Sequence, residues 1–558
     1  MSEERHLVEY LYHLLAYDPE TGLRLWTRAF DRALRAWDAE RCHLLLALVR
    51  RGSLTLPLRG RALAVHRQGQ WLMQQGHWEE AVRRFEQSLD IFRRAGDTPG
   101  ETQALIDLGN VYQATGDWER AAAYYRQALP LLQAAGDRHQ EAIAANNLAV
   151  ILGDRGRTTE AVALLQSSLE ILRREGDQLG VGRALLNLAK FSERLGEVEA
   201  AGAYYREAVT VLRAVGDLAG EVNALDRLGS YYKHGGDLDR AADYYTRSLA
   251  LAQRIHDLGG QEQALGNLGT VHQLQGRLAE AERCYREAMA LAEAQGDKSG
   301  VAFWLGNLAL ALSLQGRDEE ARPLLERQLA LSRRVGDRAG EVVALLNLGT
   351  LHRDGGRLAE AEACYREALP LAREMGHQRL EGRLLGALGS VRSKQGRFAE
   401  AEGLFRRALR LHRAQQNRQD QIGTLYKLAG LYYEQEAWDQ ARDAAEEAWR
   451  AAQGFASDRW QAQVLWLLGE IALEQGDDRG AVYLAEAALR ARRNGYERRY
   501  RSSVRSILER VALHGEAGDV ERALALCRSA LAVWEAEGDG GIMAEAVEAF
   551  RQVVRSLQ

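Results

Sequence analysis

The chain has 558 residues, of which 46% are hydrophobic and 6 are proline, and its formal net charge is −5. Such a chain lacks the global positive field that draws proteins to nucleic acid or to a membrane surface, so neither partner is expected. No apolar run is long enough to span a bilayer, and the N-terminus is unlike a signal peptide, so we expect a cytoplasmic protein. The few prolines, with many Ala, Leu, Arg and Glu residues, favour an all-helical fold.

Residues 1–56 form the first predicted unit. Helical patterns near residues 4–16, 21–36 and 38–50 precede a loop around Pro57, and they do not share the spacing of the sequence that follows. We predict an N-terminal helical cap or a segment that couples the rest of the chain to another protein.

A 40-residue period then runs through residues 57–496, where we predict eleven repeats. One position is always alanine: Ala81, Ala121, Ala161, Ala201, Ala241, Ala281, Ala321, Ala361, Ala401, Ala441 and Ala481. A second is glycine or alanine: Gly109, Ala149, Ala189, Gly229, Gly269, Ala309, Gly349, Gly389, Ala429 and Gly469. Two series of small residues predict two closely crossing helices in each repeat. A ring or a leucine four residues after the alanine of the first series, as at Tyr125 and Leu165, is predicted to fill the space beside the crossing.

Glycine and aspartate mark the predicted turns. Glycines between the two helices of a repeat are predicted to adopt a left-handed conformation: Gly76, Gly116, Gly156, Gly196, Gly236, Gly276, Gly316, Gly356, Gly396 and Gly476. Gly-Asp pairs such as Gly96-Asp97 and Gly336-Asp337 are predicted to end one repeat and cap the next. Trp78, Trp118 and Trp438, at the start of second helices, are predicted to be buried, and Pro130 and Pro370 to kink their helices.

The pattern weakens towards the C-terminus. Residues 497–537 are predicted to form a degenerate twelfth repeat, and residues 538–558 a C-terminal capping helix. Atypical terminal repeats are expected in such arrays, because their outer faces meet water.

The repeat resembles the tetratricopeptide family in Leu108-Gly109, Tyr112, Ala121, Tyr125 and Ala128. Its 40-residue form is similar to that of kinesin light chain and of the Leu-Gly-Asn repeat proteins. The N-terminal Tyr10–Leu15 with Asp18-Pro19-Glu20 resembles the spacer before the repeats of bacterial STAND signalling ATPases. The resemblance implies an all-α solenoid, a right-handed superhelix of helix–turn–helix pairs that binds partners in its concave groove.

Catalytic and metal-binding motifs are missing from the sequence. It contains no Gly-Lys pair for a Walker A loop, no H-E-x-x-H and no G-x-S-x-G, and its 4 cysteines show no C-x-x-C spacing. We therefore predict that the chain is not an enzyme and has no catalytic residues, no bound metal and no cofactor.

One first-helix position repeatedly carries asparagine: Asn147, Asn187, Asn267, Asn307 and Asn347. Asparagine is unfavourable inside helices by roughly 0.5 kcal/mol, so its recurrence needs a reason. Each amide could bond the backbone of an extended peptide, or it could bond the neighbouring repeat and hold the array together. The sequence supports both hypotheses equally, and they are compatible.

Other candidate peptide-binding residues are cationic or aromatic. Lys190, Lys233, Lys394 and Lys427 share first-helix positions expected to face the groove, with Arg183, Arg227, Arg353 and Arg383 nearby; they would suit an acidic peptide or a terminal carboxylate. Acidic residues share these positions, so a solvated helix face is the favoured alternative. Tyr426 and Trp466 could form an aromatic anchor beside Trp460, although rings at repeat positions are more often core.

Two functions follow from these patterns. The first is a protein–protein interaction scaffold that binds an extended segment of a partner in the groove. The alternative is a ligand- or trigger-sensing module of a bacterial signalling or defence system whose ATPase or effector is a separate chain. Self-association is left open, and the dominance of arginine over the five lysines suggests a GC-rich bacterial genome.

Overall fold

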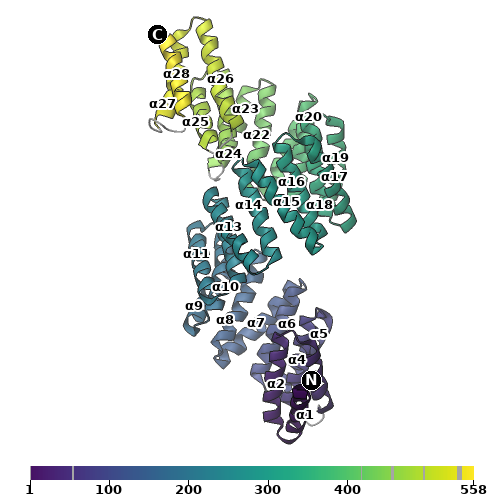
Figure 1. Cartoon of the computed structure of the whole chain (residues 1–558). Helices are drawn as coiled ribbons and strands as arrows, with labels where there is room; N and C mark the ends of the chain where they lie inside the picture. The colour runs from purple at the N-terminus through teal and green to yellow at the C-terminus, as the bar shows by residue number, and fades with distance from the viewer. Residues whose placement is uncertain are drawn as a thin grey trace. The chain divides into compact units, whose positions relative to one another are not determined.

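A computed structural model of the chain describes residues 2–52, 56–415, 417–453, 458–493, 497–536 and 543–557. Within these ranges there are 28 α-helices and no strand, which confirms the predicted all-α fold. Figure 1 shows the helices coloured along the chain. The chain divides into two compact units, Met1–Ala224 and Leu225–Gln558, with the boundary inside α12. No helix in the described ranges has the length and apolar character that crossing a bilayer requires.

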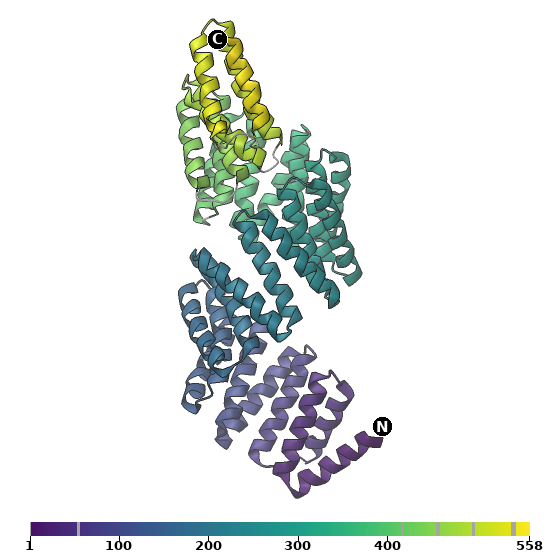
Figure 2. The ribbon, with the colours of Figure 1, turned by 60° about the vertical axis from the view of Figure 1, so that its left-hand side comes forward.

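The first unit contains α1 to α11 and the start of α12. The helices are α1 Ser2–Tyr17, α2 Pro19–Arg35, α3 Ala39–Gly52, α4 Leu58–Gln74, α5 Trp78–Ala95, α6 Thr98–Ala114, α7 Trp118–Ala135, α8 Arg138–Asp154, α9 Thr158–Glu175, α10 Gln178–Leu195, α11 Val198–Val215 and α12 Leu218–His234. From α4 onwards the helices form consecutive pairs (Figure 2). We call the even-numbered helix of each pair the first helix and its odd-numbered partner the second.

The second unit continues the same alternation as far as α25. Its helices are α13 Leu238–Arg254, α14 Leu258–Leu274, α15 Leu278–Gln295, α16 Lys298–Leu314, α17 Asp318–Val335, α18 Arg338–Asp354, α19 Leu358–Glu374, α20 Gln378–Lys394, α21 Phe398–Ala414, α22 Arg418–Glu434, α23 Trp438–Gln453, α24 Asp458–Glu474, α25 Arg479–Arg493, α26 Glu497–Glu516, α27 Val520–Glu535 and α28 Ala544–Leu557. First helices of adjacent repeats contact one another, as α16 contacts α18 and α20 contacts α22.

The turns are built as the sequence predicts. Each of the ten predicted turn glycines has a positive φ, between 73° and 85°. In two repeats a polar residue, His256 or Glu436, takes up a similar left-handed conformation at a turn. The carboxylate of Asp97 accepts from the amide of Gly100 at 3.4 Å, and that of Asp337 accepts from Gly340 at 2.9 Å, so the predicted helix caps are confirmed.

The crossing of the two helices is also as predicted. A Cβ placed on Gly109 would lie 2.5 Å from the Tyr125 ring, and one on Gly389 would lie 2.8 Å from the Phe405 ring. Most repeats with alanine instead of glycine place a smaller side chain opposite, as in the buried pair Ala149 and Leu165. The exception is Ala189, whose repeat keeps Tyr205, and nothing in the structure explains it.

Additional helices pack against both ends of the repeats. In α1 to α3 a core forms around Trp26 and Phe30, with the Trp26 indole donating to the carbonyl of Leu45 at 2.8 Å, and it extends to Trp71 of α4. At the other end, Trp534 donates to the carbonyl of Ala485 at 2.9 Å and meets the Phe550 ring edge-on. These contacts bury apolar surface on the terminal repeats that would otherwise face water.

Two local expectations have a different outcome. The tryptophan prediction was wrong for Trp78 and Trp118, which are 39% and 37% exposed, and Trp438 is half-buried. Each is the first residue of its second helix, next to the turn that joins it to the first helix, and its ring is only partly covered there. Pro130 and Pro370 lie inside α7 and α19, which continue through them, and the predicted kinks stay a prediction.

The crossing makes a prediction for Gly389. Replacing it with alanine adds helix propensity, but the methyl would strike Phe405, so we expect a net loss of about 1–3 kcal/mol from overpacking. The matched control is Gly403→Ala on α21, where the added methyl meets no atom within 4 Å, and it should not destabilise the chain. Urea denaturation of the full chain measures both variants.

A double mutant tests the mechanism. Combining Gly389→Ala with Phe405→Leu reproduces the natural alanine–leucine pairing, so it should cost less than the sum of the two single changes. Strict additivity would contradict a direct clash.

Candidate functional site

The exposed side of the first helices, turned away from the second helices, is called here the first-helix face. On α16 it carries a stripe at helical spacing, with Phe303 59% exposed, Leu310 45% exposed and Leu314 43% exposed. The half-buried Asn307 lies at the same spacing. Large apolar side chains so close together on a surface are typical of interaction sites.

Three of the five predicted asparagines bond the preceding repeat. The Asn147 amide donates to Asn110 at 3.2 Å, Asn187 donates to Asn146 at 3.2 Å, and Asn267 donates to Asp226 at 2.9 Å. These bonds support the hypothesis that the amides hold neighbouring repeats together. They leave the peptide-binding hypothesis untested.

Asn307 and Asn347 differ from the other three. Both are half-buried, and in the described part of the chain neither side chain bonds another residue. Each amide therefore has a donor and an acceptor left for a ligand.

Two predicted lysines are engaged within their own surroundings. Lys190 donates to the Asp154 carboxylate at 2.9 Å and lies 5.0 Å from the centre of the Phe191 ring. Burial lowers the pKa of Lys233, against the opposing effect of Asp226. Burial in turn raises the pKa of Asp226, despite its bond from Asn267. These lysines have less charge to offer an acidic ligand.

Four more of the predicted cations lie on three consecutive first helices, α18, α20 and α22. The Lys394 ammonium on α20 donates to the Arg353 carbonyl on α18 at 3.4 Å. Lys427 lies on α22. Arg383, on α20, acts electrostatically on Lys427 together with Arg353. We call Arg353, Arg383, Lys394 and Lys427 the basic cluster.

The charges of the basic cluster are only partly balanced. Asp354 is paired with Arg353 at 2.8 Å, and Asp420 is paired with Arg379 at 3.0 Å. Within the described ranges, the Lys427 ammonium has no ion pair and no hydrogen bond. Burial, together with the positive charges of Arg353 and Arg383, lowers the pKa of Lys427 to about 8. An anionic group placed here would relieve this repulsion.

Tyr426 and Trp466 contact different partners in the structure. The Tyr426 ring meets Trp460 edge-on at 6.4 Å, whereas Trp466 lies under the Arg499 guanidinium at 4.3 Å. Trp466 packs against two core clusters and is half-buried, as the alternative of a core role expects. Its indole nitrogen is buried without a partner among the described residues.

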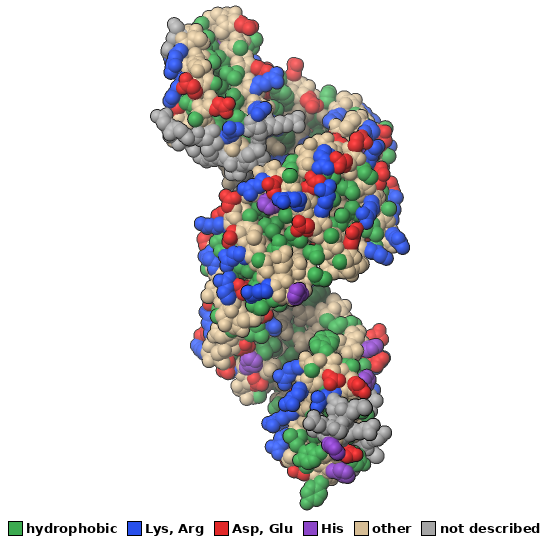
Figure 3. All heavy atoms as spheres, in the orientation of Figure 1, with side chains coloured by type: hydrophobic (Ala, Val, Ile, Leu, Met, Phe, Trp, Pro, Cys, Tyr) green, Lys and Arg blue, Asp and Glu red, His purple; other side chains and the backbone are tan. Residues whose placement is uncertain are grey.

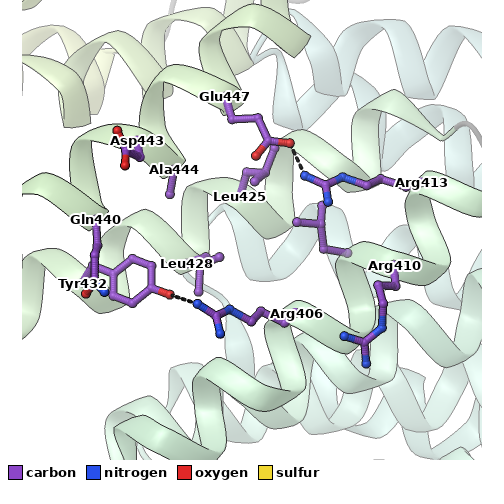
Figure 4. Close-up of a pocket in the computed structure, with 11 residues that line it drawn as sticks. Arg406, Arg410, Arg413, Leu425, Leu428, Tyr432, Gln440, Asp443, Ala444 and Glu447 are labelled. Atoms are coloured by element: carbon purple, nitrogen blue, oxygen red, sulfur yellow. Dashed lines mark hydrogen bonds and ion pairs between the residues drawn. The ribbon is translucent and has the colours of Figure 1, made fainter.

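A pocket of 490 Å³ that was not predicted from the sequence lies between α21, α22 and α23. Figure 4 shows its lining residues. Arg406 donates to the Tyr432 hydroxyl at 3.2 Å, and Arg413 is paired with Glu447. Arg410 also lines the pocket. The spacing of these three arginines along α21 places them on one side of the helix and was the available signal.

A serine, a histidine and an aspartate lie together in the first unit, which was also not foreseen. Ser88 Oγ is 3.4 Å from His66 Nδ1, and His66 Nε2 is 3.1 Å from Asp107. All three are at most 5% exposed, and Ser88 donates to the Phe85 carbonyl at 2.8 Å, so a substrate has no access to the hydroxyl. Burial would raise the pKa of Asp107, but hydrogen bonds from His66, Gln70 and Gln103 outweigh it and lower the pKa. The trio is a structural network.

No other reactive centre stands out in the described ranges. Burial raises the pKa of the Cys42, Cys284 and Cys527 thiols to about 11, so they are protonated at neutral pH. No group of three or more His, Cys, Asp and Glu residues there is placed to hold a metal ion.

Comparison of the sequence with protein families gives a match to the tetratricopeptide repeat. One model matches residues 61–134, 180–254, 260–334, 305–374 and 340–414, and a second tetratricopeptide model matches residues 142–175. No curated protein sequence matches the chain.

The comparison with solved structures gives matches that include the following three proteins. BtubC from P. vanneervenii is 26% identical, with a TM-score of 0.36, over 39% of this chain and 92% of its own. The apo quorum sensor NprR from B. thuringiensis is 16% identical, with a TM-score of 0.46, and the match covers 63% of this chain and 99% of NprR. A STAND protein with a tetratricopeptide repeat sensor from Pyrococcus horikoshii is 16% identical, with a TM-score of 0.37, and the match covers 59% of this chain and 52% of the STAND protein.

The asparagine bonds predict unequal effects of substitution. Asn267→Ala would leave the half-buried Asp226 without its donor, so we expect a loss of about 1–3 kcal/mol in stability. Asn307→Ala and Asn347→Ala break no bond in the described structure and should change the thermal midpoint little. Thermal denaturation of the three single variants measures this, and equal losses at all three positions would contradict it.

Proposed function

The chain belongs to the tetratricopeptide repeat family, and we propose that it is a protein-interaction scaffold whose first-helix face binds an extended, acidic segment of a partner protein. Arrays of this kind offer a long binding surface, because each repeat contacts only its neighbours. The proposal assigns binding, and no catalysis, to the first-helix face.

The observation that carries the proposal is the basic cluster. It concentrates four cations on α18, α20 and α22, and Lys427 is held near like charges without an ion pair among the described residues. Keeping such a group in the folded chain costs free energy, which an acidic ligand would recover. A solvated helix face would instead let each cation extend into water.

The α16 stripe and the unbonded amides extend the same surface. Phe303, Leu310 and Leu314 would cover apolar side chains of the segment, and Asn307 and Asn347 would bond its backbone. Neighbouring helices pack about 8–10 Å apart, so the three intervals from α16 to α22 span about 27 Å. An extended chain advances about 3.3 Å per residue, so about eight to ten residues would reach from the stripe to the basic cluster.

Exposed aromatic residues on α1 favour the second candidate function, a sensing module coupled to a separate effector. Tyr10 is 57% exposed, Tyr12 is 50% exposed and Tyr17 is 93% exposed. Figure 3 shows hydrophobic side chains on the surface near the N-terminal end. Such rings would suit contact with the effector chain. Co-purification of an effector that is lost in Tyr10→Ser/Tyr17→Ser, and retained when the basic cluster is reversed, would favour this function.

The main experiment selects ligands from a random 16-residue peptide library on the full chain. Enriched peptides should be acidic, and their affinity, measured by fluorescence anisotropy, should fall at least tenfold in Arg353→Glu/Lys427→Glu. The matched control is Arg410→Glu, an exposed arginine on the second helix α21, which should bind as the unmodified chain does. Enrichment of basic or uncharged peptides, or equal loss in the control, would refute the proposal.

Lys427 predicts an unusual dependence on pH. Because an acidic ligand favours the charged lysine, affinity should fall as the pH rises through about 8, and Lys427→Met should remove this dependence. The stability of the free chain should change in the opposite direction. From pH 8 towards 10.5 the unfolded lysine keeps its proton while the folded one has lost it, so stability should rise.

The five lysines make Lys427 directly observable. NMR titration of ¹³C-ε-lysine-labelled chain resolves few signals, and the Lys427 signal is assigned by its loss in Lys427→Met. An unshifted pKa near 10.5 for this signal would remove the basis of the pH prediction.

A further inference from the structure

A second surface feature lies in the first unit. A pocket of 720 Å³ opens between the end of α2 and helices α4, α5 and α6. Its apolar lining includes Leu34, Trp37, Met73 and Trp78. Pockets that bind small organic ligands have about this volume and a mainly apolar wall.

Trp37 has a strained backbone conformation and an exposed side chain. It has a φ of 55° at the turn between α2 and α3, in the left-handed region where 18 glycines of the described chain lie. A bulky side chain is strained there, and the indole is 68% exposed, so burial does not offset the strain. The other two described non-glycine residues with positive φ, His256 and Glu436, are polar. A strained, exposed tryptophan in a pocket wall indicates a role in binding.

The charges around the pocket define the ligand further. Its lining contains two arginines and no Asp or Glu. Arg67 is balanced by Asp31 at 3.1 Å. Arg35 donates through Nε to the Asp31 carbonyl at 3.2 Å, and in the described part of the chain its guanidinium has no ion pair. The rim is therefore positive, which disfavours a cation between the rings and favours an anion.

We propose that this pocket binds a small organic carboxylate with an aromatic or branched aliphatic body. The body packs against Trp37 and Trp78, and the carboxylate pairs with Arg35. The site is independent of the acidic peptide segment proposed above, which involves α16 to α22, so either proposal can fail alone.

The test uses ¹⁹F NMR of the full chain labelled with 5-fluorotryptophan. Signals of Trp37 and Trp78 are assigned with Trp37→Phe and Trp78→Phe, and the probes are 4-phenylbutyrate, its neutral amide and the matching amine. 4-Phenylbutyrate should shift both signals saturably, with the amide binding at least fivefold more weakly and the amine more weakly still. Arg35→Gln should bring the affinities of 4-phenylbutyrate and its amide within twofold of each other.

Trp37→Gly separates a binding role from a packing role. Glycine suits the left-handed turn, so the thermal midpoint should stay the same or rise, while the affinity for 4-phenylbutyrate falls at least tenfold. The control is Trp118→Phe, a tryptophan that is 37% exposed and lies outside the pocket, which should leave affinity unchanged.

Three results would overturn the proposal. One is the absence of saturable shifts at Trp37 and Trp78 with every probe. Another is a Trp37→Gly chain that has a lower thermal midpoint and still binds 4-phenylbutyrate. The third is binding of the phenyl group only when a peptide such as acetyl-Gly-Gly-Phe carries it.

Discussion

The close crossing of the two helices in each repeat is the constraint on which the rest of the structure depends. At Gly109 and Gly389 the neighbouring ring occupies the space that a Cβ would need, so the helices approach until ring and backbone touch. The crossing fixes which side of the first helix faces its partner and leaves another side exposed. Because the same contact recurs every 40 residues, that exposed side recurs on each first helix.

Charge pairing separates the ordinary surface from the candidate site. Along the second helices, arginines are paired with glutamates of neighbouring helices, as Arg213 is with Glu221 and Arg373 is with Glu381, both within 2.8 Å. Such exposed pairs contribute little free energy each, and they leave little net charge for a partner. The basic cluster departs from this pattern, which is why it has more weight in the proposed function than the many other arginines.

The asparagines at one repeat position differ in their hydrogen bonding along the array. Where the preceding repeat offers an acceptor, as Asp226 does to Asn267, the amide links first helices. Before Asn307 and Asn347 the residues at the position of Asp226 are Gly266 and Gly306, which have no side-chain acceptor. The same ladder therefore contributes to cohesion in one part of the array and leaves amides unbonded in the next.

The sequence by itself determined the period, the turns, the caps and the helix crossing. Each of these depends on residues close in sequence or at a fixed 40-residue interval, and each needs a special residue that stands out, such as glycine at Gly349 or aspartate at Asp337. The tertiary structure alone decided which cations are paired, how far Trp78 is covered, and that Trp37 and Trp78 share a pocket. Those properties depend on side chains brought together from different helices, whose distances and burial no periodic pattern encodes.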